Sequence, residues 1–154
     1  MAAKKKAKGQ IFTPESIVEF MINLSTLEDS DKDAPILEPA AGTGRFVKAL
    51  EKRGYSNIVG FEIDEDLSRE CKTEFRYEDF LFSDVPERFR LAIGNPPYIR
   101  RQNMDEELKR IMDRFVKEKK IVNTLSDFSY PFFIRSIELL EDGGELMFIT
   151  PSYW

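Results

Sequence analysis

The stretch that decides the fold is Leu91-Ala92-Ile93-Gly94-Asn95-Pro96-Pro97-Tyr98. Its apolar first half is long enough for a buried strand, and the two prolines prevent that strand from continuing beyond Gly94. In an open α/β sheet, ligands bind at the carboxyl ends of the strands, where this turn would lie. The sequence therefore predicts a buried strand that ends in a rigid turn facing a ligand.

The turn offers two hydrogen-bond acceptors beside an aromatic ring. The side-chain carbonyl of Asn95 and the main-chain carbonyl of Pro96 suit an NH2 group, which has two protons to donate. Tyr98 supplies a flat face on which a planar group can stack. The alternative is a strand ending in a proline-rich turn with one surface tyrosine, and these residues alone do not decide between the two interpretations.

Length and composition indicate one soluble globular domain. The chain has 154 residues, of which 42% are hydrophobic and 33% charged, enough to bury a core. No apolar run approaches the length of a membrane span, so we expect no membrane partner. The single cysteine, Cys71, permits no internal disulfide and fits a reducing cytoplasm. Residues 1–9 are rich in lysine without a following apolar segment, which predicts a disordered basic tail rather than a secretory signal.

The chain contains no histidine, which removes imidazole as a base or metal ligand. With one cysteine as well, the sequence argues against a zinc site, and we expect no metal. Catalysis would then depend on positioning, hydrogen bonding and stacking, or on a cofactor. A net charge of −5 argues against an extensively basic surface but leaves room for a local basic face.

Apolar runs and amphipathic stretches follow one another along the chain and predict individual strands and helices. We expect strands at residues 34–38, 57–63, 90–94 and 145–150, and a short one ending at Asp79-Phe80. Helices are predicted from Pro14 to Leu24, to about Lys52, to about Glu74, over 104–120 and over 127–140, where Gly143-Gly144 ends the last one. Thr13 is predicted to be the N-cap of the first helix.

The turn after the first strand carries small residues at positions 40 to 44, where backbone N–H groups can approach a ligand closely. Gly42 and Gly44 fit the start of a dinucleotide fingerprint, but Val47 replaces its third glycine, so pyrophosphate binding is not favoured. Glu38, which ends the strand, would repel a phosphate and attract a cationic ligand.

Two further acidic residues lie at positions where they could accept hydrogen bonds from a nucleotide. Glu62 lies 18 residues after Gly44, close to where a ribose-binding acid sits in a nucleotide-binding βαβ unit. Asp79 could accept a hydrogen bond from an adenine amino group, and Phe80 could flank the adenine ring. The alternatives are a solvated acidic cluster around Glu62 and an unremarkable Asp-Phe pair.

Residues 100–120 hold an excess of Lys and Arg over Asp and Glu in an otherwise acidic chain. This segment either faces phosphates or forms a solvated, salt-bridged helix, and the sequence leaves both open.

Taken together, these motifs resemble those of the DNA methyltransferases that modify adenine N6 using S-adenosylmethionine. The similarity is to the group that includes Type I modification subunits and fused Type II restriction–modification enzymes. It is carried, in family order, by residues 10–14 (QIFTP), 38–46 (EPAAGTGRF), 61–64 (FEID), 79–80 (DF) and 95–98 (NPPY), and extends through 127–128 and 143–145.

The resemblance implies a class I S-adenosylmethionine-dependent methyltransferase fold, a Rossmann-like doubly wound sheet, incomplete at the C-terminus. Residues 10–154 would be the catalytic domain, without the last strands and the target-recognition domain of the family. The expected partners are double-stranded DNA with a flipped adenine and a C-terminal or separate target-recognition domain. An unprotected strand at 145–150, with Phe148, Ile149, Tyr153 and Trp154 near it, also predicts self-association.

The resemblance also assigns roles to individual residues. Asn95 and Pro96 would accept from the adenine amine, and Tyr98 would stack on the flipped base. Thr13 and Glu38 would hold the methionine end of S-adenosylmethionine, Ala40 to Gly44 its backbone cradle, and Glu62 its ribose. Ile63 and Phe80 would enclose its adenine, with Asp79 on the amino group. The alternatives are a glutamine or RNA-base methyltransferase, or a module that binds cofactor without turnover.

Overall fold

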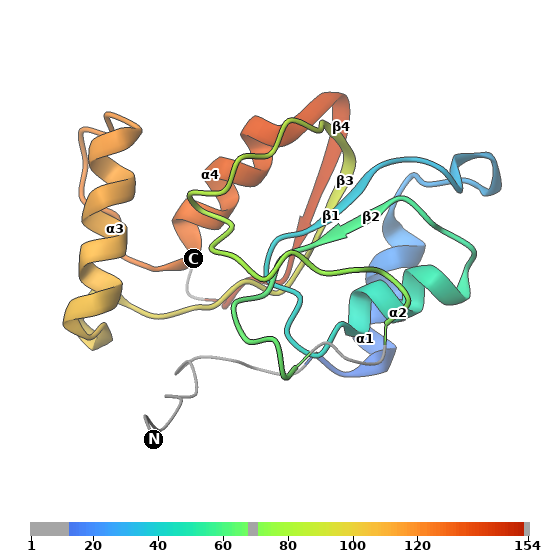
Figure 1. Ribbon diagram of the computed structural model, residues 1–154, viewed down its shortest axis with the longest axis horizontal. Helices are drawn as coiled ribbons and strands as arrows, with labels where there is room; N and C mark the ends of the chain where they lie inside the picture. Colours follow the sequence, from blue (N-terminus) through green and yellow to red (C-terminus); the bar gives the residue numbers. More distant parts are fainter. Residues whose placement is uncertain (1–12, 68–70, 153–154) are drawn as a thin grey trace.

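The computed structural model describes residues 13–67 and 71–152, which form a four-stranded parallel sheet with helices on both faces (Figure 1). The strands are β1 (Ile36–Glu38), β2 (Ile58–Gly60), β3 (Phe89–Gly94) and β4 (Leu140–Phe148), in the spatial order β2-β1-β3-β4. Because the strand order reverses between β1 and β3, their carboxyl ends border the crevice in which such sheets bind ligands. Glu38 ends β1, and Asn95 follows β3 directly.

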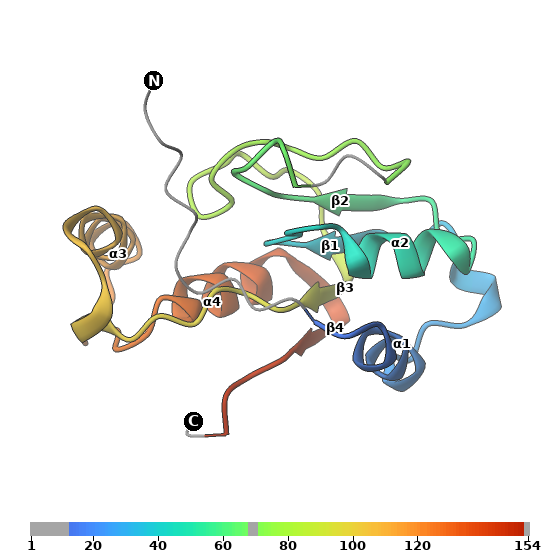
Figure 2. The ribbon, with the colours of Figure 1, turned by 90° about the horizontal axis from the view of Figure 1, so that it is seen from below.

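The helices form two layers around the sheet. Helices α1 (Glu15–Leu24) and α2 (Arg45–Lys52) cover one face, and α4 (Ser129–Leu139) covers the other (Figure 2). Helix α3 (Glu106–Glu118) stands beyond α4 at one end of the molecule (Figure 1). Two short 3-10 helices, η1 (Asp29–Asp31) and η2 (Arg101–Asn103), lie in connecting segments. Within the described ranges, no helix combines the length and apolarity needed to cross a membrane.

The core consists of two apolar clusters, one on each face of the sheet. On the side of α1 and α2, Val18, Ile22 and Leu50 pack with Ile36 and Ile93. On the other side, aromatic residues dominate, and this cluster includes Phe61, Phe80, Phe115, Phe128 and Phe132. Leu91, Ala92 and Ile93 of β3 are completely buried, which confirms the buried strand that the sequence predicts.

Most predicted elements are present with small shifts at their ends. The strands expected at 34–38, 57–63 and 90–94 are β1, β2 and β3, and the helices expected to reach Leu24 and Lys52 are α1 and α2. The helix expected over 104–120 is α3. Apolar periodicity located these segments because each buries one face or both.

The helix predicted to reach about Glu74 is wrong for the described residues 64–67 and 71–74, which form turns and bends. Side-chain carboxylates take the backbone N–H groups that a helix would have used. Asp64 accepts from the N–H of Asp66, and Glu51 accepts from the N–H groups of Lys72 and Thr73. The short strand predicted to end at Asp79-Phe80 is also absent, and a single parallel bridge joins Phe61 to Arg76 instead.

The prediction that Gly143-Gly144 ends the last helix is wrong as well. Helix α4 ends at Leu139, and β4 begins at Leu140 and runs through both glycines, five residues before the predicted strand start. The register of β4 against β3 shifts between Phe89 and Leu91, and Gly143 has a φ of 80° in this irregular stretch. The glycines therefore accommodate a bulge within the strand.

Candidate functional site

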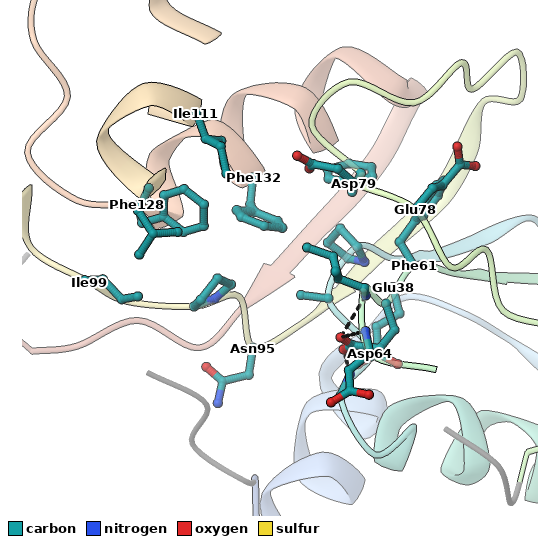
Figure 3. A pocket seen from close by; sticks show the side chains of 18 of the residues that line it. Glu38, Phe61, Asp64, Glu78, Asp79, Asn95, Ile99, Ile111, Phe128 and Phe132 are labelled. Carbon is teal, nitrogen blue, oxygen red and sulfur yellow. Dashed lines mark hydrogen bonds between the residues drawn. The ribbon is translucent and has the colours of Figure 1, made fainter. Parts of the chain in front are cut away.

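A cavity of about 480 Å³ opens at the carboxyl ends of β1 and β3 (Figure 3). Figure 3 shows Phe128 and Phe132 on one side of this pocket, Glu38 and Asp64 on the other, and Asn95 at the end of β3. The predicted site residues that line it are Thr13, Glu38, Ala40, Gly42, Glu62, Ile63, Asp79, Phe80 and Asn95. Segments that are far apart in the sequence thus meet at the edge of the sheet where the strand order reverses.

Three predicted site residues do not line this pocket: Gly44, Pro96 and Tyr98. Gly44 has a φ of 74°, and a Cβ placed on it would lie 2.4 Å from Cys71 Sγ. The absence of a side chain at Gly44 therefore serves packing behind the turn. Pro96 is buried and Tyr98 is half-buried, whereas their neighbour Pro97 reaches the cavity.

Glu38 is the deepest charged group of the pocket. Its side chain is 2% exposed, and its Oε2 has no hydrogen-bond partner within the described part of the chain. Burial raises the pKa of Glu38 well above its ordinary value of 4.5, and the nearby Glu62 adds to this, although a hydrogen bond from the backbone of Val47 opposes it. A cationic ligand in the pocket would supply the counter-charge that Glu38 lacks.

The Glu62 side chain connects the loop after β1 to the loop after β2 by hydrogen bonds. Its Oε2 accepts the Gly42 N–H at 2.7 Å, and its Oε1 accepts the N–H groups of Ile63 and Asp64 at 2.8 and 2.9 Å. These bonds turn the chain out of β2, so Ile63 is 72% exposed and the prediction that it belongs to the buried strand is wrong. Ile63 still lines the cavity, where it can flank a planar ligand.

Asp79 and Phe80 lie in a turn on the far side of the cavity. Asp79 Oδ1 accepts the Leu81 N–H at 3.0 Å, and burial raises the pKa of Asp79 despite this bond and the charges of Arg114 and Arg135. Phe80 is 2% exposed and stacks on Phe132, with ring centroids 5.9 Å apart and planes at 22°. Asp79 therefore offers an acceptor beside an aromatic wall.

Asn95 is held by the segment that precedes α1. Its Nδ2 donates to Thr13 Oγ1 at 3.1 Å, and Thr13 is itself 6% exposed. The prediction that Thr13 caps this helix is wrong, because Pro14 occupies the N-cap position and no side-chain cap is formed. Instead, the backbone carbonyl of Thr13 accepts a hydrogen bond from Arg45 Nη1 at 2.7 Å.

Three of the basic residues between positions 100 and 120 form ion pairs within this segment. Lys109 pairs with Glu106, Arg114 with Glu118, and Arg101 with Asp113, at 2.7 to 2.8 Å. Arg114 also lies over the Phe82 ring at 3.8 Å from its centroid. These contacts favour the salt-bridged interpretation of α3, the second of the two that the sequence leaves open.

Sequence reasoning missed the wall that α3 and α4 contribute. The cavity is lined by Leu108 and Ile111 of α3. It is also lined by Phe128, which precedes α4, and by Phe132 within α4. Their spacing is that of an amphipathic helix, which predicts a core face equally well. The concentration of aromatic residues between 128 and 133 is the one signal in the sequence that sets this helix apart.

The donor set fits the cofactor that the resemblance implies. S-adenosylmethionine carries an ammonium and a sulfonium group. The described residues that line the pocket include seven acids and one basic residue, Arg45; the acids are Glu38, Glu62, Asp64, Glu78, Asp79, Asp105 and Glu107. The unpartnered Oε2 of Glu38 suits the ammonium, and the aromatic wall suits a planar adenine.

Comparison with known proteins supports this assignment. Residues 16–154 match the family described as the Eco57I restriction-modification methylase. The Type II methyltransferase M.HincII of Haemophilus influenzae is 40% identical over 152 residues, which cover 99% of this chain and 29% of M.HincII. The Type II methyltransferase M.TthHB8I of Thermus thermophilus is 33% identical to this chain, and the matched segment covers 36% of M.TthHB8I. The chain thus spans about a third of the length of these relatives.

Solved structures establish the fold class. The Type I restriction-modification system methyltransferase subunit of Streptococcus thermophilus superposes with a TM-score of 0.60 at 20% identity, over 90% of this chain and 34% of that subunit. A structure from Listeria monocytogenes is described as a class I S-adenosylmethionine-dependent methyltransferase. It superposes with a TM-score of 0.64 at 18% identity, over 90% of this chain and 45% of that protein. The fold is therefore the class I S-adenosylmethionine-dependent methyltransferase fold, and the chain belongs to the Eco57I restriction-modification methylase family.

Proposed function

We propose that this chain carries the methyl-transfer site of a DNA methyltransferase that acts on adenine N6 with S-adenosylmethionine as cofactor. The observation that carries the proposal is that Asn95 lines the same cavity as Glu38, Glu62 and Phe80. Methyl transfer needs the donor and the acceptor to meet in one site, and this cavity joins an acidic, aromatic half to an amide-bearing turn.

The Asn95 turn supplies the acceptors that an amino group needs. Adenine N6 is a weak nucleophile because its lone pair is delocalised into the ring. Hydrogen bonds from both N–H groups, to Asn95 Oδ1 and the Pro96 carbonyl, favour a more electron-rich nitrogen and stabilise the positive charge that develops during attack. The product loses its proton readily to water, so no histidine is required.

The other site residues hold the cofactor in this proposal. Glu38 and Thr13 bind its methionine end, Ala40 to Gly44 form the backbone cradle, and Glu62 accepts from the ribose hydroxyls. Asp79 accepts from its adenine amino group, between Ile63 and Phe80. S-adenosylmethionine supplies the methyl group when bound, and the protein residues orient the acceptor and exclude water.

Tyr98 is proposed to stack on the target base after the base leaves the duplex. Family membership favours double-stranded DNA over the alternative substrates, a protein glutamine or an RNA base, that the sequence motif admits. We further propose that target recognition belongs to a separate domain or chain and that the protein acts in the cytoplasm. Residues 1–9, the proposed basic tail, lie outside the described residues.

The test measures cofactor binding and transfer separately. Calorimetric titration should show that S-adenosylmethionine binds the chain. Tritium-labelled cofactor should then place label in duplex DNA, and digestion to nucleosides should yield N6-methyldeoxyadenosine. Asn95→Ala should abolish transfer and leave the cofactor dissociation constant nearly unchanged, because the amide is proposed to contact the target amine.

The control is Asn103→Ala, which removes an amide that lines the cavity but lies outside the turn at 95–98. This variant should retain transfer. Label in cytosine, in RNA or in protein would contradict the adenine assignment. Equal loss of cofactor binding in Asn95→Ala would show that Asn95 belongs to the cofactor site.

A further inference from the structure

Thr13 connects the two functional turns of the site through its backbone and its side chain. Its carbonyl accepts from Arg45 Nη1 at 2.7 Å, and Arg45 is the first residue of α2, directly after the glycine turn. Its hydroxyl accepts from Asn95 Nδ2 at 3.1 Å, at the end of β3. Thr13 is therefore fixed between the proposed cofactor cradle and the proposed methyl-acceptor turn.

The Asn95 carboxamide directs its Nδ2 to Thr13 Oγ1, which is one of the two orientations that the group can adopt. An amide presents a donor NH2 and an acceptor oxygen that exchange places when the group rotates by half a turn. With Nδ2 directed to Thr13 Oγ1, Oδ1 is left on the side away from Thr13. A target NH2 requires an acceptor, so this is the orientation that methyl transfer needs.

The same bond also restricts the Thr13 hydroxyl. A hydroxyl has one proton and two lone pairs, and one lone pair is engaged by Asn95. Among the described residues, none is found to accept the Thr13 proton, and Thr13 lines the cavity while being 6% exposed. The proton is thus available to a ligand acceptor in the cavity, such as the carboxylate of the cofactor's methionine end.

We propose that Thr13 is a positioning residue that orients the Asn95 carboxamide and makes this orientation sensitive to cofactor occupancy. When the hydroxyl proton is donated into the cavity, a lone pair is directed to Asn95 Nδ2, and Asn95 Oδ1 stays directed away from Thr13. The inference rests on the proposed function for the role of Asn95, but the hydrogen bond itself can be tested without any methyl acceptor.

The primary readout is the side-chain amide resonance of Asn95 in 15N NMR spectra of the full chain, assigned by its loss in Asn95→Ala. Thr13→Val keeps the shape of the side chain and removes the hydroxyl, so the Asn95 resonance should shift and its hydrogen exchange should accelerate. Thr13→Ser should keep the wild-type resonance. S-adenosylhomocysteine should move this resonance in the wild type and in Thr13→Ser, but not in Thr13→Val.

Thr73→Val is the matched control. Thr73 Oγ1 donates to Glu51 at 2.7 Å and does not line the cavity, so the same chemical change there should leave Asn95 unaffected. Should Thr13→Val fail to fold, Thr13→Ala removes the hydroxyl without a second methyl group to accommodate.

Kinetics give the second readout. For Thr13→Val, kcat should fall about 10- to 100-fold while KM for DNA changes by less than about 3-fold, and Thr13→Ser should restore kcat. An Asn95 resonance that is identical in wild type and Thr13→Val would overturn the inference, as would a rate loss explained entirely by weaker cofactor binding. Absence of DNA methylation with the expected NMR shifts would instead reject the proposed function and leave the Thr13–Asn95 relation standing.

Discussion

At the scale of single residues, Glu38 shows how a protein can hold a carboxyl group at a cost in stability. Position 38 ends a buried strand, so the side chain enters a cavity wall that contributes one backbone hydrogen bond and leaves Oε2 unpartnered in the described chain. An ionised carboxylate in this environment is destabilising unless a cation joins it. The same property makes Glu38 selective for a cationic ligand.

We therefore expect Glu38→Gln to be more stable than the wild type at high pH. The folded-state pKa of Glu38 is raised above its unfolded value of about 4.5, so the native state binds more protons than the unfolded state between these two values. The free energy of unfolding of the wild type should fall as pH rises through this window, by up to about 1.4 kcal/mol per pH unit. The free energy of unfolding of Glu38→Gln should not show this fall with rising pH.

Urea unfolding at a series of pH values, without cofactor, measures the difference. Glu65→Gln, an exposed acid beyond β2, is the control and should follow the wild type. Glu38→Gln should also weaken S-adenosylmethionine binding about 10- to 100-fold, because a charge-assisted hydrogen bond is lost. A parallel pH dependence of wild type and Glu38→Gln would contradict the assignment of the buried charge.

Single residues also mark the limit of what the sequence could predict. Glu38, Glu62 and Asn95 could be placed because each follows an apolar strand, and strand ends meet at one edge of a parallel sheet. The contact of Thr13 with Asn95 joins residues 82 positions apart and has no periodic signature. Local propensity instead favoured Thr13 as a helix cap, since Thr before Pro and Glu is a common helix start.

At the scale of elements, the turn between β1 and α2 combines two glycines with different tasks. Both have positive φ, 55° at Gly42 and 74° at Gly44. A Cβ on Gly42 would meet nothing within 4 Å, whereas a Cβ on Gly44 would overlap Cys71 Sγ at 2.4 Å and approach Phe75 at 3.3 Å. Gly42 is thus needed for its conformation, and Gly44 for its conformation and for space.

This difference predicts unequal effects of the two alanine substitutions. Gly42→Ala should lower the free energy of unfolding by about 1 kcal/mol, the cost of a left-handed non-glycine residue. Gly44→Ala should lower it by about 2–4 kcal/mol, because overlap within a packed core adds to the same strain. Urea denaturation of both variants measures the comparison, and equal losses would show that the packing against Cys71 relaxes without cost.

Elements differ in how far their sequence determines them. The strands β1, β2 and β3 are short apolar runs that are buried on both faces, so periodicity found them. The described residues 64–67 and 71–74 carry good helix formers, yet Glu51 of α2 accepts the backbone N–H groups of Lys72 and Thr73, a tertiary contact that propensity does not contain. Strand β4 was displaced in the prediction because two glycines resemble a helix end and in fact lie in a bulge.

At the scale of the whole molecule, the sheet ends in strand β4, which among the described strands pairs only with β3. Ile149 donates its N–H to Gly94, so alternation directs the backbone groups of Met147 and Glu145 to β3 as well. The N–H groups of Leu146 and Phe148 then face away from the sheet. An edge of this kind offers hydrogen-bonding groups to a further strand.

We expect the isolated chain to self-associate through this edge at high concentration, and Leu146→Pro to abolish the association. Proline removes the outward N–H of residue 146 without removing a bond to β3, a position at which edge strands tolerate it. Leu146→Ala is the matched control, because it loses the same side-chain packing and keeps the N–H. Multi-angle light scattering should show dimers or larger species for the wild type and Leu146→Ala, and monomers for Leu146→Pro. Equal association of both variants would place the contact elsewhere on the surface, and a monomeric wild type at high concentration would show that the edge is protected by another part of the chain.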